Sequence, residues 1–402
     1  MLDLDLIKTA ASRIDGVAVK TPFAFAPLLS EISGANIFVK KENLQITGAF
    51  KLRGAFNKVA SLSAEQRAKG IIAASAGNHA QGVAFSAKHF NANAVIVMPE
   101  STPITKINGV TSLGAQVVLA GSNYDEAYAH AIKKAQEENL EFIHPFEDEE
   151  VIAGQGTVAL EMLAEQDLDV IIVPVGGGGL ISGIATAAKA INPKIKIIGV
   201  SALGAPAMKL SFESKKAIDT TSVRTIADGI AVRDTSLITL GYIMNSVDDL
   251  ISVDEEEIAS AILYLLEKQK LVVEGAGAVG IAALMHGKIE GLKDKKVGIV
   301  ISGGNIDVTM LNVIIEKGLL KSNRKMKLMV TLVDKPGSLM NLTELLQGLY
   351  ANIVHIAYDR TSTSLDYGDA SVTIHLETKG KAHQDEIREV LHEHGYLSAE
   401  MN

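Results

Sequence analysis

The sequence predicts an α/β protein built on parallel sheets, with a smaller α+β unit after it. Two observations carry this prediction. Short runs rich in isoleucine and valine alternate with helical patterns, and after about residue 320 the order becomes strand, helix, strand, strand, helix, short strand. Continuous apolar strands separated by helices are typical of parallel sheets that are covered on both faces. The later order is that of the ferredoxin-like fold.

Seven runs are expected to form the parallel strands, namely 35–40, 70–75, 93–99, 116–121, 169–175, 196–201 and 296–302. Ligands of such sheets bind beyond the carboxyl ends of the strands. Three of these ends carry small and polar residues, in "SAGNH", "GGGGL" and "SGGN", which predicts one cleft. In the final unit Ala370, Val372, Ile374 and Leu376 alternate with polar residues, so one face of that strand should pack against helices.

Composition excludes several classes of protein. The chain has 402 residues, 47% of them hydrophobic, which suffices for two or three packed domains. Its formal charge is −9 and it has no basic tract, so nucleic acid is not an expected partner. Because there is no cysteine, disulfides, thiolate metal sites and a cysteine nucleophile are excluded.

The sequence contains one segment that could be mistaken for a signal peptide and one that could be mistaken for a membrane span, and each is better explained otherwise. The N-terminal stretch carries Asp3 and Asp5 and predicts an amphipathic helix instead of a signal peptide, so we expect a cytoplasmic protein. The uncharged run 170–188 contains Pro174 and four glycines. It predicts a buried strand, a glycine loop and a helix, and therefore no membrane partner.

The segment 47–59, "TGAFKLRGAFNKV", places a lysine where local physics disfavours it. Thr47 and Gly48 are expected to cap and open a helix, and the spacing of Phe50, Ala55 and Val59 predicts its apolar face. Lys51 then falls in the first turns, where the helix dipole is positive and an exposed ammonium is disfavoured by roughly 0.3–1 kcal/mol. A lysine at such an unfavourable position raises the question of what it is for.

Four consecutive glycines, Gly176 to Gly179, follow the strand that ends at Val175, and a helix is expected to begin near Leu180. Backbone N–H groups at a positive helix terminus suit a phosphate, and glycine removes the side chains that would keep an anion away. A tight turn is the alternative, but one turn rarely needs four glycines. We therefore predict an anion site.

Two further strand ends carry polar groups. Ser75, Gly77, Asn78 and His79 stand at a strand-to-helix junction that could hold a carboxylate and a phenolic oxygen. His79, taken alone, is better interpreted as an interior histidine. In the junction 302–305 the Ser302 hydroxyl could meet a ring nitrogen, although by itself this segment would be an ordinary turn.

Other motifs are weaker. A G-x-G-x-x-G pattern occurs at Gly275, Gly277 and Gly280, but the acid that should follow the next strand is missing, so tight helix packing is the better interpretation. The acid run 254–257 is expected to open a helix. No histidine has the spacing of a metal site, and none is predicted.

Taken together, "ENLQITGAFKLRGA", "SAGNHAQG", "GGGGL" and "SGGN" resemble motifs of the threonine dehydratases, which are fold-type II pyridoxal phosphate enzymes. The resemblance covers about residues 1–320 and implies a two-lobed catalytic domain like the tryptophan synthase β subunit, with a smaller lobe at roughly 48–150. Residues 325–402 resemble an ACT regulatory domain.

This resemblance implies pyridoxal 5′-phosphate as cofactor and assigns a role to each motif. Lys51 would form the Schiff base with the cofactor and act as the base. The other expected cofactor contacts are Phe50, Asn78, Gly176, Gly177, Gly178, Gly179, Leu180 and Ser302, and the expected substrate contacts are Ser75, Ala76, Gly77 and His79. The implied reaction converts L-threonine to 2-oxobutanoate and ammonia, and L-serine to pyruvate.

Several alternatives stay open at this stage. A serine or threonine racemase is the main rival within the fold, a β-replacement synthase is a weaker one, and a non-catalytic amino-acid sensor is a third. Related enzymes bind a divalent cation near the position of Ser201, where an acid is missing here, so no metal site is carried over. We expect an amino-acid or nucleotide effector and a homo-oligomer, either a dimer or a tetramer.

Overall fold

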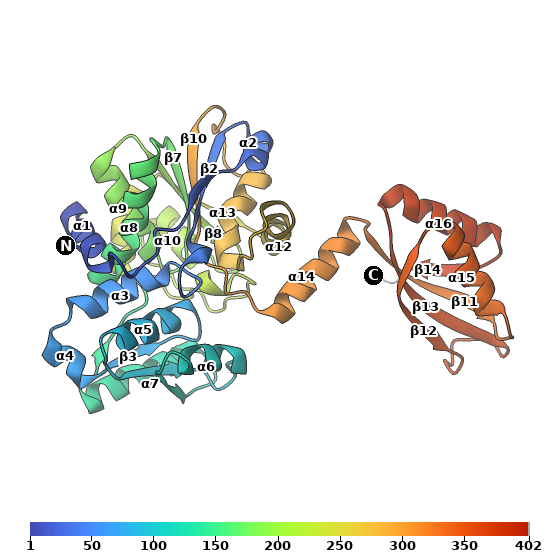
Figure 1. Ribbon diagram of the computed structural model, residues 1–402, viewed down its shortest axis with the longest axis horizontal. Coiled ribbons are helices and arrows are strands. Elements are labelled where there is room, and N and C mark those ends of the chain that lie inside the picture. Colours follow the sequence, from blue (N-terminus) through green and yellow to red (C-terminus); the bar gives the residue numbers. More distant parts are fainter. Residues whose placement is uncertain (401–402) are drawn as a thin grey trace. The chain divides into compact units, whose positions relative to one another are not determined.

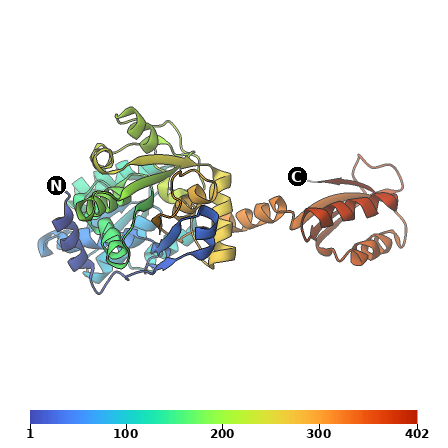
Figure 2. The same cartoon turned by 90° about the horizontal axis from the view of Figure 1, so that it is seen from above.

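The computed structural model describes residues 1–400 (Figures 1 and 2). The chain divides into two compact units, Met1–Asp307 and a second that begins at Val308. The sequence prediction places the boundary at about residue 320, which lies inside helix α14 (Val308–Lys321). This helix is counted with the second unit.

A six-stranded sheet forms the centre of the first unit. Its strands follow the order β1 (Phe23–Phe25), β2 (Asn36–Lys41), β10 (Lys296–Ile301), β7 (Val170–Pro174), β8 (Lys196–Ala202) and β9 (Asp249–Val253). All neighbours are parallel except β1 and β2. Alternate residues of β7 contact different layers, since Ile171 and Val173 join the core with α8 and α9 whereas Ile172 lies against α13.

The helices of this part are bounded as follows: α1 (Leu4–Ile14), α2 (Pro27–Ser33), α8 (Glu149–Glu165), α9 (Gly179–Ile191), α10 (Ala207–Ser214), α11 (Leu237–Ser246), α12 (Glu255–Tyr264) and α13 (Gly275–Met285), with the short turns η1 (Glu42–Leu44), η2 (Asp228–Ile230) and η3 (Leu265–Gln269). Helix α1 confirms the predicted amphipathic N-terminal helix, with Ile7, Ala10 and Ile14 buried. Helices thus cover both faces of the sheet (Figure 1).

A second parallel sheet has the order β5 (Gln116–Leu119), β4 (Ala94–Met98), β3 (Ile71–Ala74) and β6 (Glu141–Phe142). With it pack α3 (Lys51–Ser61), α4 (Ala64–Lys69), α5 (Asn78–His89), α6 (Ile104–Thr111) and α7 (Tyr124–Glu138). One face of β3 joins the core of α3 and α5, and the other packs on the alanines of α7. We call this sheet and these helices, residues 51–142, the small lobe.

All seven predicted strands are confirmed. Three more, β1, β6 and β9, were not predicted from the sequence. β1 and β6 have only three and two residues, too few to show a pattern, and β9 is an edge strand whose sequence "DLISV" mixes polar and apolar residues. Among residues 1–400, none of the helices combines the length and apolar composition needed to cross a bilayer.

The predicted cap of the lysine helix is wrong. Helix α3 begins only at Lys51, with Phe50 as its N-cap residue and no side-chain capping bond. The chain first runs beside the end of β10, where Ala49 bridges to Gly303 and the Phe50 N–H donates to the Ser302 carbonyl at 3.0 Å. This pairing delays the helix, and the Thr47 hydroxyl is buried without a partner among the described residues.

Two weaker predictions about helices are confirmed. Asp254 caps α12 through a capping box with Glu257, so the acid run does open a helix. The three glycines of the G-x-G-x-x-G pattern lie in α13 and allow close packing. A Cβ on Gly277 would come within 2.6 Å of the Gly303 carbonyl oxygen, and one on Gly280 within 2.9 Å of Ile299.

The second unit follows α14 with β11 (Lys325–Val333), α15 (Ser338–Gly348), β12 (Asn352–Asp359), β13 (Asp369–Glu377), α16 (Lys381–Glu393) and β14 (Leu397–Glu400). The sheet order is β12-β13-β11-β14, and every pair is antiparallel. This is the predicted ferredoxin-like arrangement. The alternation expected in β13 is confirmed, because Ala370, Val372, Ile374 and Leu376 are all buried.

Candidate active site

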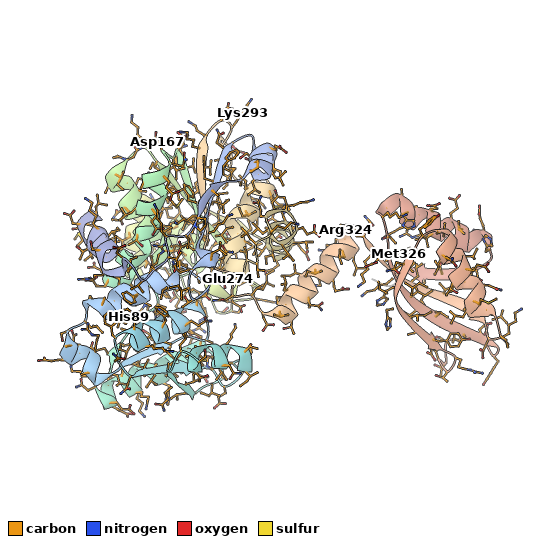
Figure 3. The ribbon with its side chains drawn as sticks, viewed as in Figure 1. His89, Asp167, Glu274, Lys293, Arg324 and Met326 are labelled. Atoms are coloured by element: carbon orange, nitrogen blue, oxygen red, sulfur yellow. The ribbon has the colours of Figure 1, made fainter. Side chains whose placement is uncertain are left out.

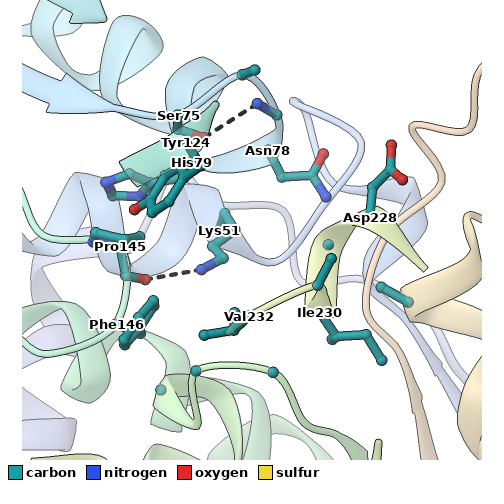
Figure 4. Close-up of a pocket in the computed structure, with 18 of the residues that line it drawn as sticks. Lys51, Ser75, Asn78, His79, Tyr124, Pro145, Phe146, Asp228, Ile230 and Val232 are labelled. Carbon is teal, nitrogen blue, oxygen red and sulfur yellow. Dashed lines mark hydrogen bonds between the residues drawn. The ribbon is translucent and has the colours of Figure 1, made fainter. Parts of the chain in front are cut away.

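The carboxyl ends of β3, β7 and β10 meet at one cavity of about 1110 Å³ (Figure 4). Polar groups from both lobes line it, so the predicted single cleft exists. Every candidate residue from the sequence lies on its wall: Phe50, Lys51, Ser75, Ala76, Gly77, Asn78, His79, Gly176, Gly177, Gly178, Gly179, Leu180 and Ser302.

Lys51, the first residue of α3, points its amine into this cavity. The Nζ atom donates a hydrogen bond to the carbonyl oxygen of Pro145 at 2.9 Å (Figure 4). Desolvation of the ammonium lowers the pKa of Lys51 to about 8, against the opposing charge of Glu274. With this pKa about a tenth of the amine is neutral at pH 7, far more than for an exposed lysine, and this neutral form is available as a nucleophile or base.

The glycine loop leaves a row of amides free. Gly178 has a φ of +87° and caps α9 without a side chain. Within residues 1–400, the N–H groups of residues 176 to 180 donate to no other protein atom. The turn is also tightly packed, since a Cβ on Gly177 would lie 2.5 Å from the Phe146 ring and one on Gly176 would lie 2.7 Å from the Cα of Ile230. The absence of side chains therefore allows the loop to pack closely and leaves its N–H groups accessible.

The start of α5 is a second helix terminus without a side-chain cap. Its N-cap is Gly77, which has no capping side chain and donates its own N–H to the Ser75 hydroxyl at 3.2 Å (Figure 4). The N–H groups of Asn78 and His79 have no acceptor in the described chain. This terminus can hold an anionic group such as a carboxylate. Ala76, between Ser75 and Gly77, presents only a methyl group.

The side chain of Asn78 is held by Glu274, a buried carboxyl that the sequence did not reveal. The Asn78 Nδ2 atom donates to Glu274 at 2.8 Å, and its Oδ1 atom accepts from Asn305 at 2.7 Å. Burial raises the pKa of Glu274 to about 7, despite the hydrogen bond from Asn78. Figure 3 labels Glu274, which directly precedes α13. Its only sequence signal is an acid in front of a helix, which is usually a simple cap.

Two histidines near the lysine stay neutral. Burial, together with the charge of Lys51, lowers the pKa of His79 to about 3, and only 3% of this residue is exposed. Its Nε2 atom lies 2.9 Å from the Ile143 carbonyl, whereas Nδ1 has no partner in the described chain. Desolvation likewise lowers the pKa of His144 to about 4. Neither imidazole therefore adds a positive charge to the cavity at neutral pH.

The remaining wall of the cavity was not predicted. It is largely aromatic on one side, where Tyr128 and Phe146 each contact the ring of His144 edge to face. On another side η2 and the residues after it complete the wall, with Asp228, Ile230 and Val232 labelled in Figure 4. No sequence motif marks these residues, because Tyr128 is one of many polar and aromatic residues of α7 and the others lie on connections without a regular pattern.

Ser302 stands at the end of β10 and is 2% exposed. Its hydroxyl makes no hydrogen bond to the rest of the described chain, although it lines the cavity. A neutral hydroxyl without a partner, a row of free amides and a lysine with a lowered pKa fit the ring nitrogen, phosphate and aldehyde of pyridoxal phosphate. Within residues 1–400, no three His, Cys, Asp or Glu side chains gather as they would around a metal ion.

Comparison with known proteins agrees with this geometry. Residues 14–303 match the family model described as pyridoxal-phosphate dependent enzyme. An L-threonine ammonia-lyase of Thermotoga maritima is 47% identical over 397 residues, covering 98% of both chains. An L-threonine ammonia-lyase of Geobacter sulfurreducens is 47% identical over 398 residues, covering 99% of both.

Solved structures share the fold of the first unit. The processed form of threonine deaminase isoform 2 from Solanum lycopersicum matches with a TM-score of 0.75 and 38% identity, covering 79% of this chain and 88% of that one. Maize serine racemase matches with a TM-score of 0.75 and 36% identity, covering 80% of this chain and 99% of that one. The chain therefore belongs to the pyridoxal-phosphate dependent enzymes and, among them, to the family of the L-threonine ammonia-lyases.

Proposed function

We propose that this chain is an L-threonine ammonia-lyase that converts L-threonine to 2-oxobutanoate and ammonia, and L-serine to pyruvate. The observation that carries the proposal is Lys51, an amine with a pKa of about 8 that lies in the same cavity as the backbone N–H groups of the glycine loop. Near-full-length identity of 47% to two L-threonine ammonia-lyases supports the same activity.

The cofactor would be held from three directions. The free amides of residues 176 to 180 suit the phosphate and the Ser302 hydroxyl suits the ring nitrogen, while Phe50, which lines the same cavity, would lie beside the ring. Asn78 still has one amide hydrogen available for the phenolic oxygen, because only one of its two hydrogens goes to Glu274. When bound, pyridoxal phosphate draws electrons from the α-carbon of the amino acid, so that the α-proton and the β-hydroxyl can leave.

The residues of the chain would divide the remaining work. The free N–H groups at the start of α5 would bind the substrate carboxylate, with the Ser75 hydroxyl beside them. Lys51 would take the α-proton, since its amine is partly neutral at physiological pH. The neutral His79 and His144 would keep positive charge away from this base.

The structural similarity to maize serine racemase makes racemisation the second candidate activity. A racemase needs a proton donor or acceptor on each face of the α-carbon. Lys51 supplies one, but the methyl group of Ala76 cannot supply the other. We therefore favour elimination over racemisation. A non-catalytic sensor is disfavoured because Lys51 shares its cavity with the glycine loop, Asn78 and Ser302.

A direct assay tests the proposal. The purified protein, incubated with pyridoxal phosphate and L-threonine, should release 2-oxobutanoate and ammonia in equal amounts. Borohydride should fix the cofactor on Lys51, detected as a mass increase of the peptide that carries it. Absence of both products together with absence of the covalent label would contradict the proposal.

Regulation is part of the same proposal. The ferredoxin-like unit at 325–402 would act as an ACT domain that binds an amino-acid effector, with a nucleotide as the alternative effector. All proposed cofactor contacts lie before residue 303, so this unit is free for such a role. The homo-oligomer and the cytoplasmic location stay predictions.

A further inference from the structure

Four charged side chains form a buried cluster beside the lysine helix, and none of them lines the cavity. Arg53 on α3 is at its centre and is fully buried, as are Lys40 on β2 and Glu42 on η1. Glu161 on α8 completes the set, with its side chain 20% exposed. The cluster holds two positive and two negative charges and is therefore neutral.

Every donor group of the Arg53 guanidinium is used. Its Nε and Nη2 atoms donate to the two carboxylate oxygens of Glu42, each at 2.8 Å. Its Nη1 and Nη2 atoms donate to the two oxygens of Glu161 at 2.6 and 3.0 Å. Further bonds reach Thr157 at 3.3 Å and the Val19 carbonyl at 3.2 Å. Such paired bonds fix direction as well as distance.

Stability alone does not account for this arrangement. Removing charges from water is costly, and apolar side chains of similar volume often replace buried ion pairs at no loss of stability. Burial by itself would raise the pKa of Glu42, but the charge and hydrogen bonds of Arg53 outweigh it and keep that pKa below its ordinary value. Glu42 and Arg53 therefore both stay ionised. The contribution that we assign to these charges is a fixed orientation of α3.

The backbone of α3 is also pressed against α8. A Cβ on Gly154 would lie 2.6 Å from the Arg53 carbonyl oxygen, and one on Gly54 would lie 2.5 Å from the Val151 carbonyl oxygen. Glycine contacts of this kind set the distance between the helices. The Gly54 N–H also donates to Gln155 at 3.1 Å, and Asn57 donates to the Glu150 carbonyl at 2.7 Å. The forked bonds of Arg53 add two pairs of directed contacts and join α3 to η1 as well as to α8.

Rotation of α3 matters because Lys51 is its first residue and no side chain caps that end. A side-chain atom about 6 Å from a helix axis moves by about 1 Å when the helix turns by about 10°. A displacement of about 1 Å at a reacting group can lower a rate by about 10²-fold.

We propose that Arg53 is a positioning residue, which fixes the rotation of α3 and so places the Lys51 amine for its reaction. The inference rests on the proposed role of Lys51 as cofactor anchor and base. Arg53 touches neither the cavity nor its contents, and acts through the helix that both residues share.

The test is Arg53→Lys in the cofactor-loaded full chain, because lysine keeps the charge but not the fork. We expect kcat to fall by ~10–100-fold with little change in KM, and the visible circular dichroism of the bound cofactor to weaken as its fixed orientation is lost. The matched control is Lys58→Met, which breaks the Lys58–Asp148 ion pair of 2.6 Å at the other end of α3. This control should lower thermal stability without changing kcat or the dichroism.

If Arg53→Lys does not fold, Glu161→Gln decides the question, because it weakens the same cluster at its most exposed member. A smaller fall in kcat and in the dichroism is expected. A folded Arg53→Lys or Glu161→Gln protein that loses thermal stability but keeps wild-type kcat and dichroism would overturn the inference. Inactivity of the wild-type chain toward threonine would instead contradict the proposed function.

Discussion

Asn78 and Glu274, which are 196 residues apart in the chain, share a hydrogen bond of 2.8 Å at the edge of the cavity. Asn78 opens a helix of the small lobe, whereas Glu274 precedes α13 on the larger sheet. The bond therefore ties the two lobes together beside Lys51. It also leaves a carboxyl group with a raised pKa beside the proposed site for an anionic ligand.

This carboxyl should make stability depend on pH. Its pKa is about 7 in the folded chain and about 4.5 when unfolded, so the folded state binds the proton more tightly. The stabilising contribution is complete below about pH 4.5 and is lost as pH rises to about 7, a difference of about 3 kcal/mol. Glu274→Gln should abolish this loss.

The measurement is thermal unfolding of the cofactor-free protein at pH 5 and pH 8. Relative to wild type, Glu274→Gln should gain stability between the two values, whereas Glu290→Gln, at an exposed site, should not. Equal pH dependence in wild type and Glu274→Gln would mean that the carboxyl is already ionised at pH 5.

Lys51→Ala should abolish turnover and leave the fold intact. The side chain is the proposed base, and acid–base help is worth ~10²–10⁴-fold even before its anchoring role is counted. Some cofactor should still bind through the glycine loop. Ammonia release, the melting temperature and the absorbance of cofactor retained by the protein measure the three properties, and near-normal ammonia release by the variant would refute the assignment.

Cofactor uptake by the apoprotein should follow the titration of Lys51. The neutral amine is the nucleophile, and burial sets its pKa at about 8. The rate of uptake should therefore rise with pH and level off above about 8. Absorbance of the bound cofactor, followed after mixing at several pH values, gives the rate. A rate still rising steeply at pH 10 would indicate an ordinary exposed lysine.

The sequence predicted the parts of the fold that local pattern encodes. Apolar runs marked seven strands, and glycines marked the loop at residues 176 to 179, because each depends on its own neighbours in the chain. The cap at Thr47 failed because pairing of Ala49 with Gly303 overrides the local signal. Glu274 was missed for a similar reason, since its partner lies 196 residues away.

The cavity illustrates the same limit. Polar strand ends predicted one cleft, since the carboxyl ends of parallel strands share an edge. Its aromatic wall could not be predicted, because Tyr128, His144 and Phe146 are brought together only by the turn that follows β6 and by the packing of α7. Their place in the wall depends on tertiary contacts, which produce no periodic pattern in the sequence.

A chain that ends at Lys321 should stay catalytic and lose its response to effectors. The residues that line the cavity lie within Met1–Asp307. Coupling between such sites is typically worth ~1–3 kcal/mol, so threonine saturation curves with and without isoleucine or ADP should differ in the full chain only. An unchanged effector response after truncation would place the regulatory site in the first unit.

Ala76 should make the enzyme eliminate and hardly racemise. The residue lines the cavity between Ser75 and Gly77 and presents only a methyl group there. Racemisation requires proton transfer on both faces of the α-carbon, and a methyl group transfers none. Incubation with L-serine, followed by chiral chromatography, should therefore show pyruvate and little D-serine. Ala76→Ser should raise D-serine, while D-serine formed by wild type as fast as pyruvate would defeat the ammonia-lyase proposal.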